Sequence, residues 1–154
     1  MKEYPDVITG NESIDVHGSP LNTLIYFYRA FNSGDLQAME KNWEQSAEAS
    51  MSNPLGGVKR GWKEIKQVYQ RIFTGPAKVY VEYYDYSLHK TEEMCTVVGR
   101  ERGFFKLGTQ KLELAIRTSR IFRLTDGQWR QLHHHGSIDM PDKLAAYQEA
   151  VQQR

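Results

Sequence analysis

The sequence predicts an α+β fold in which three N-terminal helices pack on a curved and mainly antiparallel sheet. Apolar residues recur at helical spacing up to position 74, and four long runs rich in β-branched and aromatic residues follow from position 78. Only short polar breaks separate these runs, and breaks of that length join antiparallel neighbours. Helices first and strands second is the segregated order in which helices cover one face of a sheet.

Composition limits the classes of function. The chain has 154 residues, about one domain, with 40% hydrophobic and 25% charged residues, which is typical of a globular protein. The formal net charge of +1 offers no overall field for nucleic acid or an anionic membrane, so we expect neither as a partner. The single Cys95 and the lack of a signal-like or membrane-spanning apolar run favour a cytoplasmic location.

The first helix has a clear start and end. Residues 1–18 are polar and aperiodic, which predicts a loose N-terminal arm before a single domain over 19–154. Ser19 can accept a hydrogen bond from a free amide of the first turn, and Pro20 suits the first helical position, where no N–H is needed. Gly34 tolerates the left-handed conformation that ends many helices.

Two more helices and a short strand complete the first half. Asp35 caps the second helix. Residues 47–52 are predicted as a short strand, closed by the turn-forming run 53–57. A third helix ends before the Gly-Pro pair at 75–76, and its apolar positions are Ile65, Val68, Tyr69 and Ile72.

The second half is predicted as a meander of strands that a helix follows. Helical spacing returns after Pro141, which indicates a C-terminal helix. The four predicted strands span residues 79–88, 94–105, 110–124 and 128–136.

The two faces of the longest predicted strand, 110–124, separate by parity. Its odd positions are mostly polar, and its even positions form an apolar stripe that only Thr118 and Arg120 interrupt. Arginine cannot lose its charge, so an inward Arg120 needs an anion or several acceptors. Three interpretations stay open: an ion pair within the chain, a β-bulge that reverses the parity, and a ligand that supplies the anion.

The run from His133 to His135 is internal, and strand geometry divides it between two faces. His133 and His135 share one face with Trp129, while His134 shares the other with Leu132. A metal site needs three or four ligands, and this run does not supply them, so we expect no metal. One parity then places a single imidazole in the interior as a hydrogen-bonding or proton-transfer group.

The sequence lacks the usual motifs of nucleotide and nucleophile chemistry. Gly56-Gly57 belongs to no phosphate-binding loop or dinucleotide fingerprint, so we expect no cofactor. Cys95 has no local cue for a lowered pKa and is predicted to be a small packing residue.

Three local strings, taken in order, resemble a known superfamily. They are YRAFNSGDL at 28–36, NPLGG at 53–57 leading into Gly61-Trp62, and DGQWRQLHHH at 126–135. Over about residues 19–140 the chain resembles the nuclear-transport-factor-2-like superfamily. The resemblance implies a cone-shaped α+β fold with a pocket between helices and sheet. Ketosteroid isomerases, SnoaL-type polyketide cyclases, limonene epoxide hydrolases and the association domain of calmodulin-dependent kinase share that fold, which does not specify one function.

Comparison with ketosteroid isomerases argues against their mechanism. Their catalytic carboxylate falls on Asn53, their tyrosine on Phe27 and their protonated aspartate on Arg120. An amide cannot abstract a proton at neutral pH, and a phenyl ring cannot donate a hydrogen bond. The same comparison places Arg120 toward the pocket.

Comparison with the kinase association domain implies further site residues. That domain has arginines facing its pocket on two central strands, at positions that match Arg100 and Arg120, with Arg102 one register step away from the first. The resemblance also implies that His134 faces the pocket. It places His133, His135 and Trp129 on the outer sheet face, which commonly forms a dimer contact, and so implies a homodimer.

These arguments converge on a small dimeric, cytoplasmic protein that binds a small organic anion, a carboxylate, anchored by Arg120 in a conical pocket. Two other functions stay open: a SnoaL-like cyclase, isomerase or hydrolase in which His134 is the acid or base, and an association domain with a vestigial pocket. The expected ligand-binding residues are Tyr28, Asn53, Trp62, Arg100, Arg120, Phe122 and His134.

Overall fold

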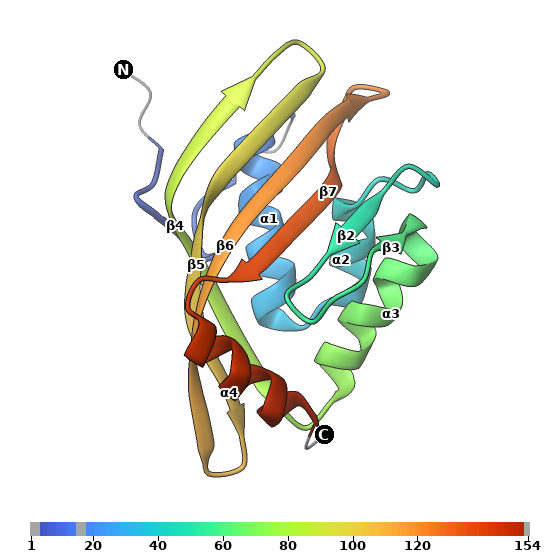
Figure 1. Cartoon of the computed structure of the whole chain (residues 1–154). Helices are drawn as coiled ribbons and strands as arrows, with labels where there is room; N and C mark the ends of the chain where they lie inside the picture. The colour runs from blue at the N-terminus through green and yellow to red at the C-terminus, as the bar shows by residue number, and fades with distance from the viewer. Residues whose placement is uncertain (1–3, 15–17, 153–154) are drawn as a thin grey trace.

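Four long antiparallel strands form the centre of the sheet. In the computed structural model, which describes residues 4–14 and 18–152, the sheet has the order β1-β4-β5-β6-β7-β2-β3 (Figure 1). All pairings are antiparallel except that of β2 with β7. The prediction of an α+β fold with a mainly antiparallel sheet is therefore confirmed. The strands are β1 (Val7–Ile8), β2 (Ser50–Ser52), β3 (Lys59–Arg60), β4 (Lys78–Lys90), β5 (Met94–Leu107), β6 (Gln110–Thr125) and β7 (Gln128–Ile138).

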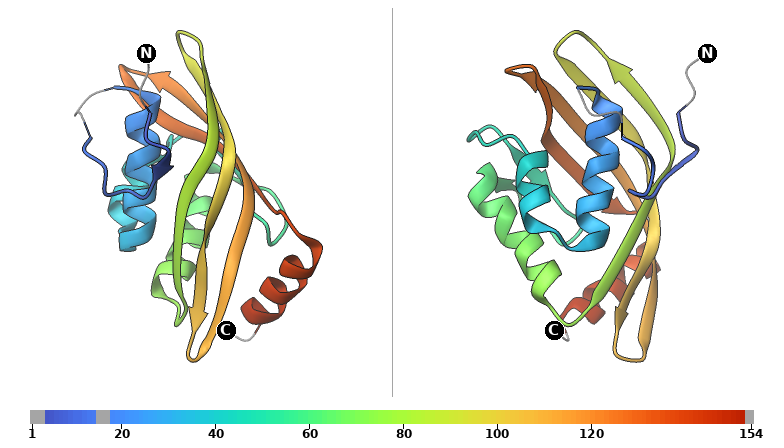
Figure 2. Two further views of the ribbon diagram at one scale, coloured as in Figure 1. Left: turned by 90° about the vertical axis from the view of Figure 1, so that its left-hand side faces the viewer. Right: turned by 180° about the vertical axis from the view of Figure 1, so that it is seen from behind.

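Three helices precede the long strands and pack beside them, and a fourth follows. Both predicted N-terminal caps form. Ser19 Oγ accepts a hydrogen bond from the Asn22 amide at the start of the first helix, and the Asp35 carboxylate accepts one from the Ala38 amide at the start of the second, both at 3.0 Å. The last helix crosses the end of the molecule where the β5–β6 hairpin lies (Figures 1 and 2). The helices are α1 (Pro20–Ser33), α2 (Leu36–Asn42), α3 (Gly61–Thr74) and α4 (Pro141–Gln152).

Part of the N-terminal arm is held on the domain, which differs from the predicted loose arm over 1–18. Strand β1 pairs with β4, and Ile8 is fully buried. Arg29 Nε on α1 donates to the Gly10 carbonyl oxygen at 2.7 Å. A two-residue strand is too short to show the alternation of apolar and polar residues that identifies a strand, so the sequence pattern did not predict β1. Residues 1–3 and 15–17 of the arm lie outside the described residues.

A β-bulge changes which face several β7 residues occupy. Ile121 on β6 pairs with His133, but the next residue, Phe122, pairs with Gln131, so Leu132 is an extra residue on β7. Alternation therefore reverses at this point. Trp129, which is 7% exposed, faces inward like His134 and does not share the outer face with His133 as predicted. The sequence analysis considered a bulge in β6, but the extra residue lies in β7, the strand that pairs with it.

The interior is rich in stacked aromatic side chains. The Tyr28 ring on α1 stacks on Tyr83 of β4 with centroids 5.6 Å apart, and Cys95 is buried in the same core.

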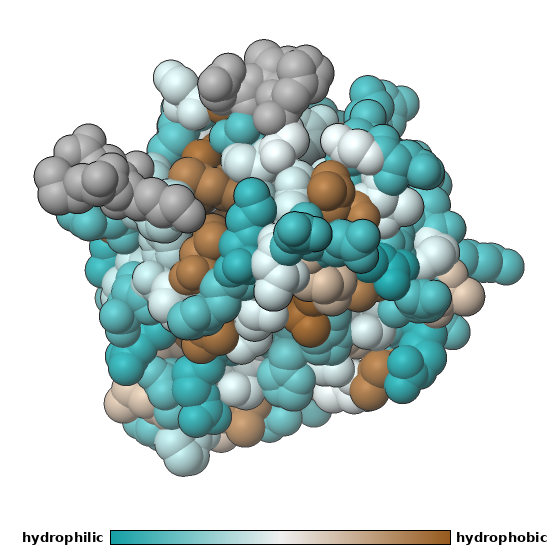
Figure 3. All heavy atoms as spheres, turned by 90° about the horizontal axis from the view of Figure 1, so that it is seen from above, coloured by the Kyte–Doolittle hydropathy of each residue, from teal (hydrophilic) through white to brown (hydrophobic). Residues whose placement is uncertain are grey.

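None of the helices within residues 4–14 and 18–152 is long and apolar enough to cross a membrane. At the end of the molecule opposite α4, apolar residues form small groups among hydrophilic ones (Figure 3).

Candidate functional site

A cavity of about 480 Å³ lies between the helices and the sheet. Side chains from α1, α3 and α4 and from β2 to β7 reach it, which makes it a shared interior space of the fold. Most of its wall is apolar, and its size is in the usual range for small-molecule sites. Representative apolar lining residues are Phe31, Met51, Val68, Val81, Leu114 and Ile116.

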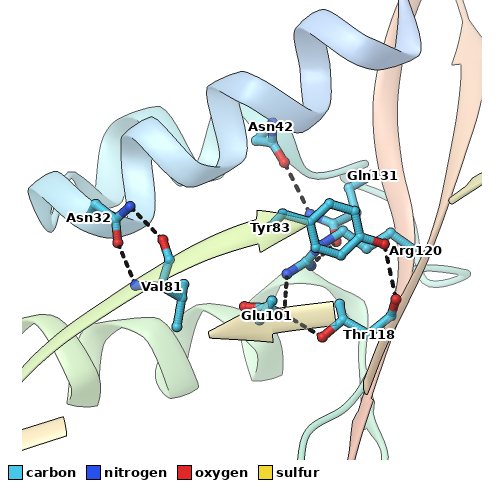
Figure 4. Close-up of polar contacts among 8 residues, drawn as sticks. All are labelled: Asn32, Asn42, Val81, Tyr83, Glu101, Thr118, Arg120 and Gln131. Atoms are coloured by element: carbon cyan, nitrogen blue, oxygen red, sulfur yellow. Dashed lines mark hydrogen bonds and ion pairs between the residues drawn. The ribbon is translucent and has the colours of Figure 1, made fainter. Parts of the chain in front are cut away.

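Arg120 lies in the wall of this cavity and is 1% exposed, as the parity of β6 predicts. Its Nη1 donates to Gln131 Oε1 at 2.5 Å, and its Nη2 lies 3.5 Å from Glu101 Oε1 (Figure 4). The guanidinium carbon stands 3.7 Å from the centre of the Phe27 ring, a cation–π contact. Of the three interpretations that the sequence left open, the ion pair within the chain is therefore present.

The carboxylate partner, Glu101, is a site residue that the sequence analysis missed. Arg100 and Arg102 point to the outer face instead, where Arg100 Nε lies 3.2 Å from Asp85 and Arg102 Nε lies 2.7 Å from Glu82. Neither arginine faces the cavity, so the inward placement expected for Arg100 is wrong. The parity of β5 could have predicted that Glu101 faces inward. The buried apolar residues of this strand, Cys95, Val97 and Phe105, have odd numbers, as Glu101 does.

A chain of buried hydrogen bonds fixes this polar end of the cavity. Thr118 Oγ1 donates to Glu101 Oε1 at 2.5 Å, next to Arg120 (Figure 4). Beyond Arg120, Gln131 Nε2 donates to Asn42 Oδ1 at 3.1 Å, and Asn42 Nδ2 donates to the Thr23 carbonyl oxygen at 2.8 Å. The network thus ties β5, β6 and β7 to α2 and α1. A buried network of this kind restricts its members to one arrangement.

Two ionisable groups of the polar end have displaced pKa values. Burial lowers the pKa of His134 well below its usual value, and the positive charge of Arg120 lowers it further, so the imidazole is neutral at neutral pH. Burial acts to lower the pKa of Arg120 as well, but Tyr28 and Glu101 outweigh it and raise that pKa. Among the described residues, neither ring nitrogen of His134 has a hydrogen-bond partner, and Arg120 Nε has none.

The cavity brings together three of the seven predicted ligand-binding residues: Asn53, Arg120 and His134. Arg100 lies outside, and the other three are core residues that do not line the cavity. Trp62 Nε1 donates to Glu40 Oε1 at 3.0 Å, away from the polar end. Tyr28 and Phe122 are fully buried behind the wall. The predicted inward position of His134 agrees with the structure.

Charged side chains around the cavity are mainly cationic. Lys59 on β3 and Arg71 on α3 join Arg120 in the lining, and Glu101 is the one carboxylate among the lining residues that the structure describes. Arg71 is exposed and Lys59 is half-buried, so these two lie at the solvent side. No group of three or more potential metal-ligating side chains gathers within residues 4–14 and 18–152.

N-terminal helices on a mostly antiparallel sheet, with a mostly apolar cavity between them, are typical of the nuclear-transport-factor-2-like class of α+β proteins. A family model described as a SnoaL-like domain matches residues 21–142. The chain therefore belongs to the SnoaL-like domain family. A comparison with curated proteins finds no match.

Solved structures share this fold at low sequence identity. One is a protein provisionally named as a calcium/calmodulin-dependent protein kinase type II association domain from Thiobacillus denitrificans, with a TM-score of 0.66, 20% identity and coverage of 84% of this chain and 100% of that chain. Another, from Streptomyces avermitilis, is provisionally named as a dehydratase of the nuclear-transport-factor-2-like family. It has a TM-score of 0.68 and 21% identity, and the match covers 77% of this chain and 91% of that chain. A third, a nuclear-transport-factor-2-like protein of unknown function in nutrient uptake from Rhodospirillum rubrum, has a TM-score of 0.66 and 20% identity, and the match covers 80% of this chain and 100% of that chain.

Proposed function

We propose that the cavity binds a small organic anion with an apolar body. The observation that carries this proposal is the composition of the cavity wall, which is mostly apolar and has three cationic side chains against one carboxylate. Apolar walls with a few polar groups are typical of ligand sites, and an excess of positive charge favours a carboxylate over its neutral analogue.

Arg120 is the anchor in this proposal, although Glu101 lies beside it. A guanidinium has five N–H donors, and the described residues engage two of its terminal nitrogens, one each through Gln131 and Glu101. The 3.5 Å contact with Glu101 is longer than a charge-assisted hydrogen bond of about 2.8 Å. The guanidinium therefore keeps donor capacity, and its contacts with Gln131 and Phe27 hold it in place before a ligand arrives.

A thermal-shift comparison of small carboxylates with their matched amides tests the proposal. A ligand of the folded state adds RT ln(1 + [L]/Kd) to the free energy of unfolding, about 2.7 kcal/mol at a hundredfold excess over Kd. We expect the acids, and not the amides, to stabilise the wild type. Arg120→Lys keeps the charge but lacks the planar fork, and should weaken the effect strongly. Equal stabilisation by acids and amides would overturn the proposal.

The solvent-side cations provide a matched control. Lys59→Gln combined with Arg71→Gln removes two positive charges without touching the buried network. If Arg120 is the anchor, this double variant should lose less acid binding than Arg120→Lys does. If the double variant lost more acid binding than Arg120→Lys, the anchor would be Lys59 and Arg71 at the solvent side.

A second candidate function is proton transfer on the bound acid. The specific observation is His134, a neutral imidazole in the cavity wall with both ring nitrogens unpartnered among the described residues. It could take a proton from the carbon next to a carbonyl group, leaving the electron pair on an enolate that Arg120 stabilises, and return the proton afterwards. Exchange of that hydrogen for solvent deuterium should occur in the wild type and stop in His134→Gln. Persistent exchange in the variant would exclude this role.

We also propose that the chain forms a homodimer through the outer sheet face. Val98 on β5 is 47% exposed there, and it pairs with Ser119, which pairs in turn with His135. Trp129 no longer belongs to this surface. Sedimentation should give a dimer for the wild type and a monomer for Val98→Asp. An unchanged mass in Val98→Asp would contradict this interface. A dimer whose cavity binds no ligand would correspond to the association-domain function.

A further inference from the structure

We propose that α4 forms the far end wall of the cavity and that Tyr147 on it limits the length of the ligand's apolar body. This inference rests on the proposed anion binding. It assigns to the ligand an elongated shape, with an acidic head at Arg120 and an apolar tail that runs toward α4. Tyr147 and Val151 are the two α4 residues that line the cavity.

The position of α4 supports an end wall. The helix leaves the end of β7 and reaches toward the end of α3, across the part of the sheet nearest the β5–β6 hairpin (Figures 1 and 2). The Tyr147 ring meets the Phe105 ring edge-on, with centroids 5.7 Å apart. Phe105 lies four residues beyond Glu101 on β5, which corresponds to about 13 Å along the strand at roughly 3.3 Å per residue. The polar end and the α4 wall are therefore well separated.

The lining between these two ends is apolar. Val79 and Val81 on β4 and Leu114 and Ile116 on β6 all line this stretch of the cavity. A hydrocarbon or aryl tail can be buried against them, and each additional buried methylene group tightens Kd about fourfold until the wall is reached. The gain should then stop, because the tail would have to displace Tyr147.

The helix packs at the edge of the core, with Tyr147 and Val151 partly buried against it. Within α4, Ala150 is the one residue classed as buried among those described. Its ion pair, from Lys143 Nζ to Glu113 Oε2, spans 3.8 Å, and Glu113 is 85% exposed, so it stabilises little. The family match ends at residue 142, so nearly all of α4 lies beyond it. Because Tyr147 and Val151 are partly buried at the edge of the core, substitutions there change the wall and leave the fully buried core residues in place, which suits a determinant of ligand length.

A chain-length series of linear monocarboxylic acids, from butanoate to hexadecanoate, tests the inference by thermal shift. In the wild type, stabilisation at equal acid concentration should rise with length and then stop. Tyr147→Ala should move this limit to longer acids by several carbons. Val151→Phe, which adds volume at the wall, should move it to shorter acids. Each shift is measured against the same variant without ligand, so a change in intrinsic stability does not enter.

Two matched controls separate wall volume from other effects. Tyr147→Phe keeps the ring and should keep the wild-type limit. Gln148→Ala alters an exposed position on the same helix and should keep it too. If acids bind but all variants share one limit, the inference about α4 is wrong while the proposed function stands. If no acid of any length stabilises the wild type, the proposed function fails and this inference fails with it.

Discussion

Replacing Arg120 by methionine should leave the Glu101 carboxylate buried without its cationic partner. Glu101 is 5% exposed and would keep the Thr118 hydroxyl as its hydrogen-bond donor. Removing one partner of a buried ion pair costs about 3–5 kcal/mol. Because the cavity adjoins Glu101 and can hold water, we take the lower end, about 3 kcal/mol. For a chain of this size that loss lowers Tm by roughly 10 °C.

A double-mutant cycle isolates the pair from other effects of the substitution. Replacing both Arg120 and Glu101 by methionine removes both charges, and such apolar replacement of a buried pair is often close to neutral. We therefore expect the double variant to be more stable than the sum of the single changes predicts, by about 2 kcal/mol or more. The loss of the Phe27 cation–π contact is common to both Arg120 variants and cancels in the cycle.

Equilibrium urea unfolding, followed by circular dichroism, provides the free energies. The midpoint should fall in Arg120→Met while the slope with denaturant stays unchanged, which shows that stability and not compactness has changed. A loss below about 1 kcal/mol, or single effects that simply add, would refute the reasoning, because Glu101 would then be solvated independently of Arg120.

Three further perturbations test separate parts of the structure. Acidification below about pH 6.5 should lower the free energy of unfolding by at most about 1.4 kcal/mol per pH unit for each of His134 and His133, because burial depresses both pKa values in the folded state and the unfolded chain then binds the extra protons. Urea midpoints between about pH 7 and pH 5 measure this slope, and His134→Gln should reduce it to the part that His133 contributes. Gly103→Ala would place a Cβ in overlap with the Tyr80 carbonyl oxygen, so β4 and β5 must separate, at a cost of more than about 2 kcal/mol. Gly136→Ala meets its nearest atom at 3.1 Å and should cost less in the same urea assay. Ile8→Ala should cost about 2–4 kcal/mol if β1 is held on the sheet, and close to zero if the arm is loose.

Local chemistry allowed most of the elements to be predicted. Ser19 and Asp35 cap their helices through their own side chains, and Gly34 ends α1 in the left-handed conformation, with φ 66°. The inward position of Arg120 followed from alternation along one uninterrupted strand. Each of these features depends on residues within a few positions of one another, so a sequence pattern contains them.

Features that depend on pairing between strands escaped the same reasoning. Extending strict alternation through β7 placed Trp129 outward, because the extra residue Leu132 is visible only in the pairing of β7 with β6. The family resemblance placed Arg100 inward, whereas the register turns Glu101 toward the cavity. A shift of one residue moves every following side chain to the other face, so a small error in register changes the list of site residues.

The sequence by itself determined the order of helices and strands, the faces of β6 and the need of Arg120 for a partner, since these follow from backbone periodicity and from a charge that cannot be removed. Only the tertiary structure decided what that partner is. Glu101 lies 19 positions and Gln131 lies 11 positions from Arg120 along the chain, on the two strands that flank β6. No local pattern records which side chains meet across a sheet, because strand register, bulges and the packing of α2 behind Gln131 are settled together when the chain folds.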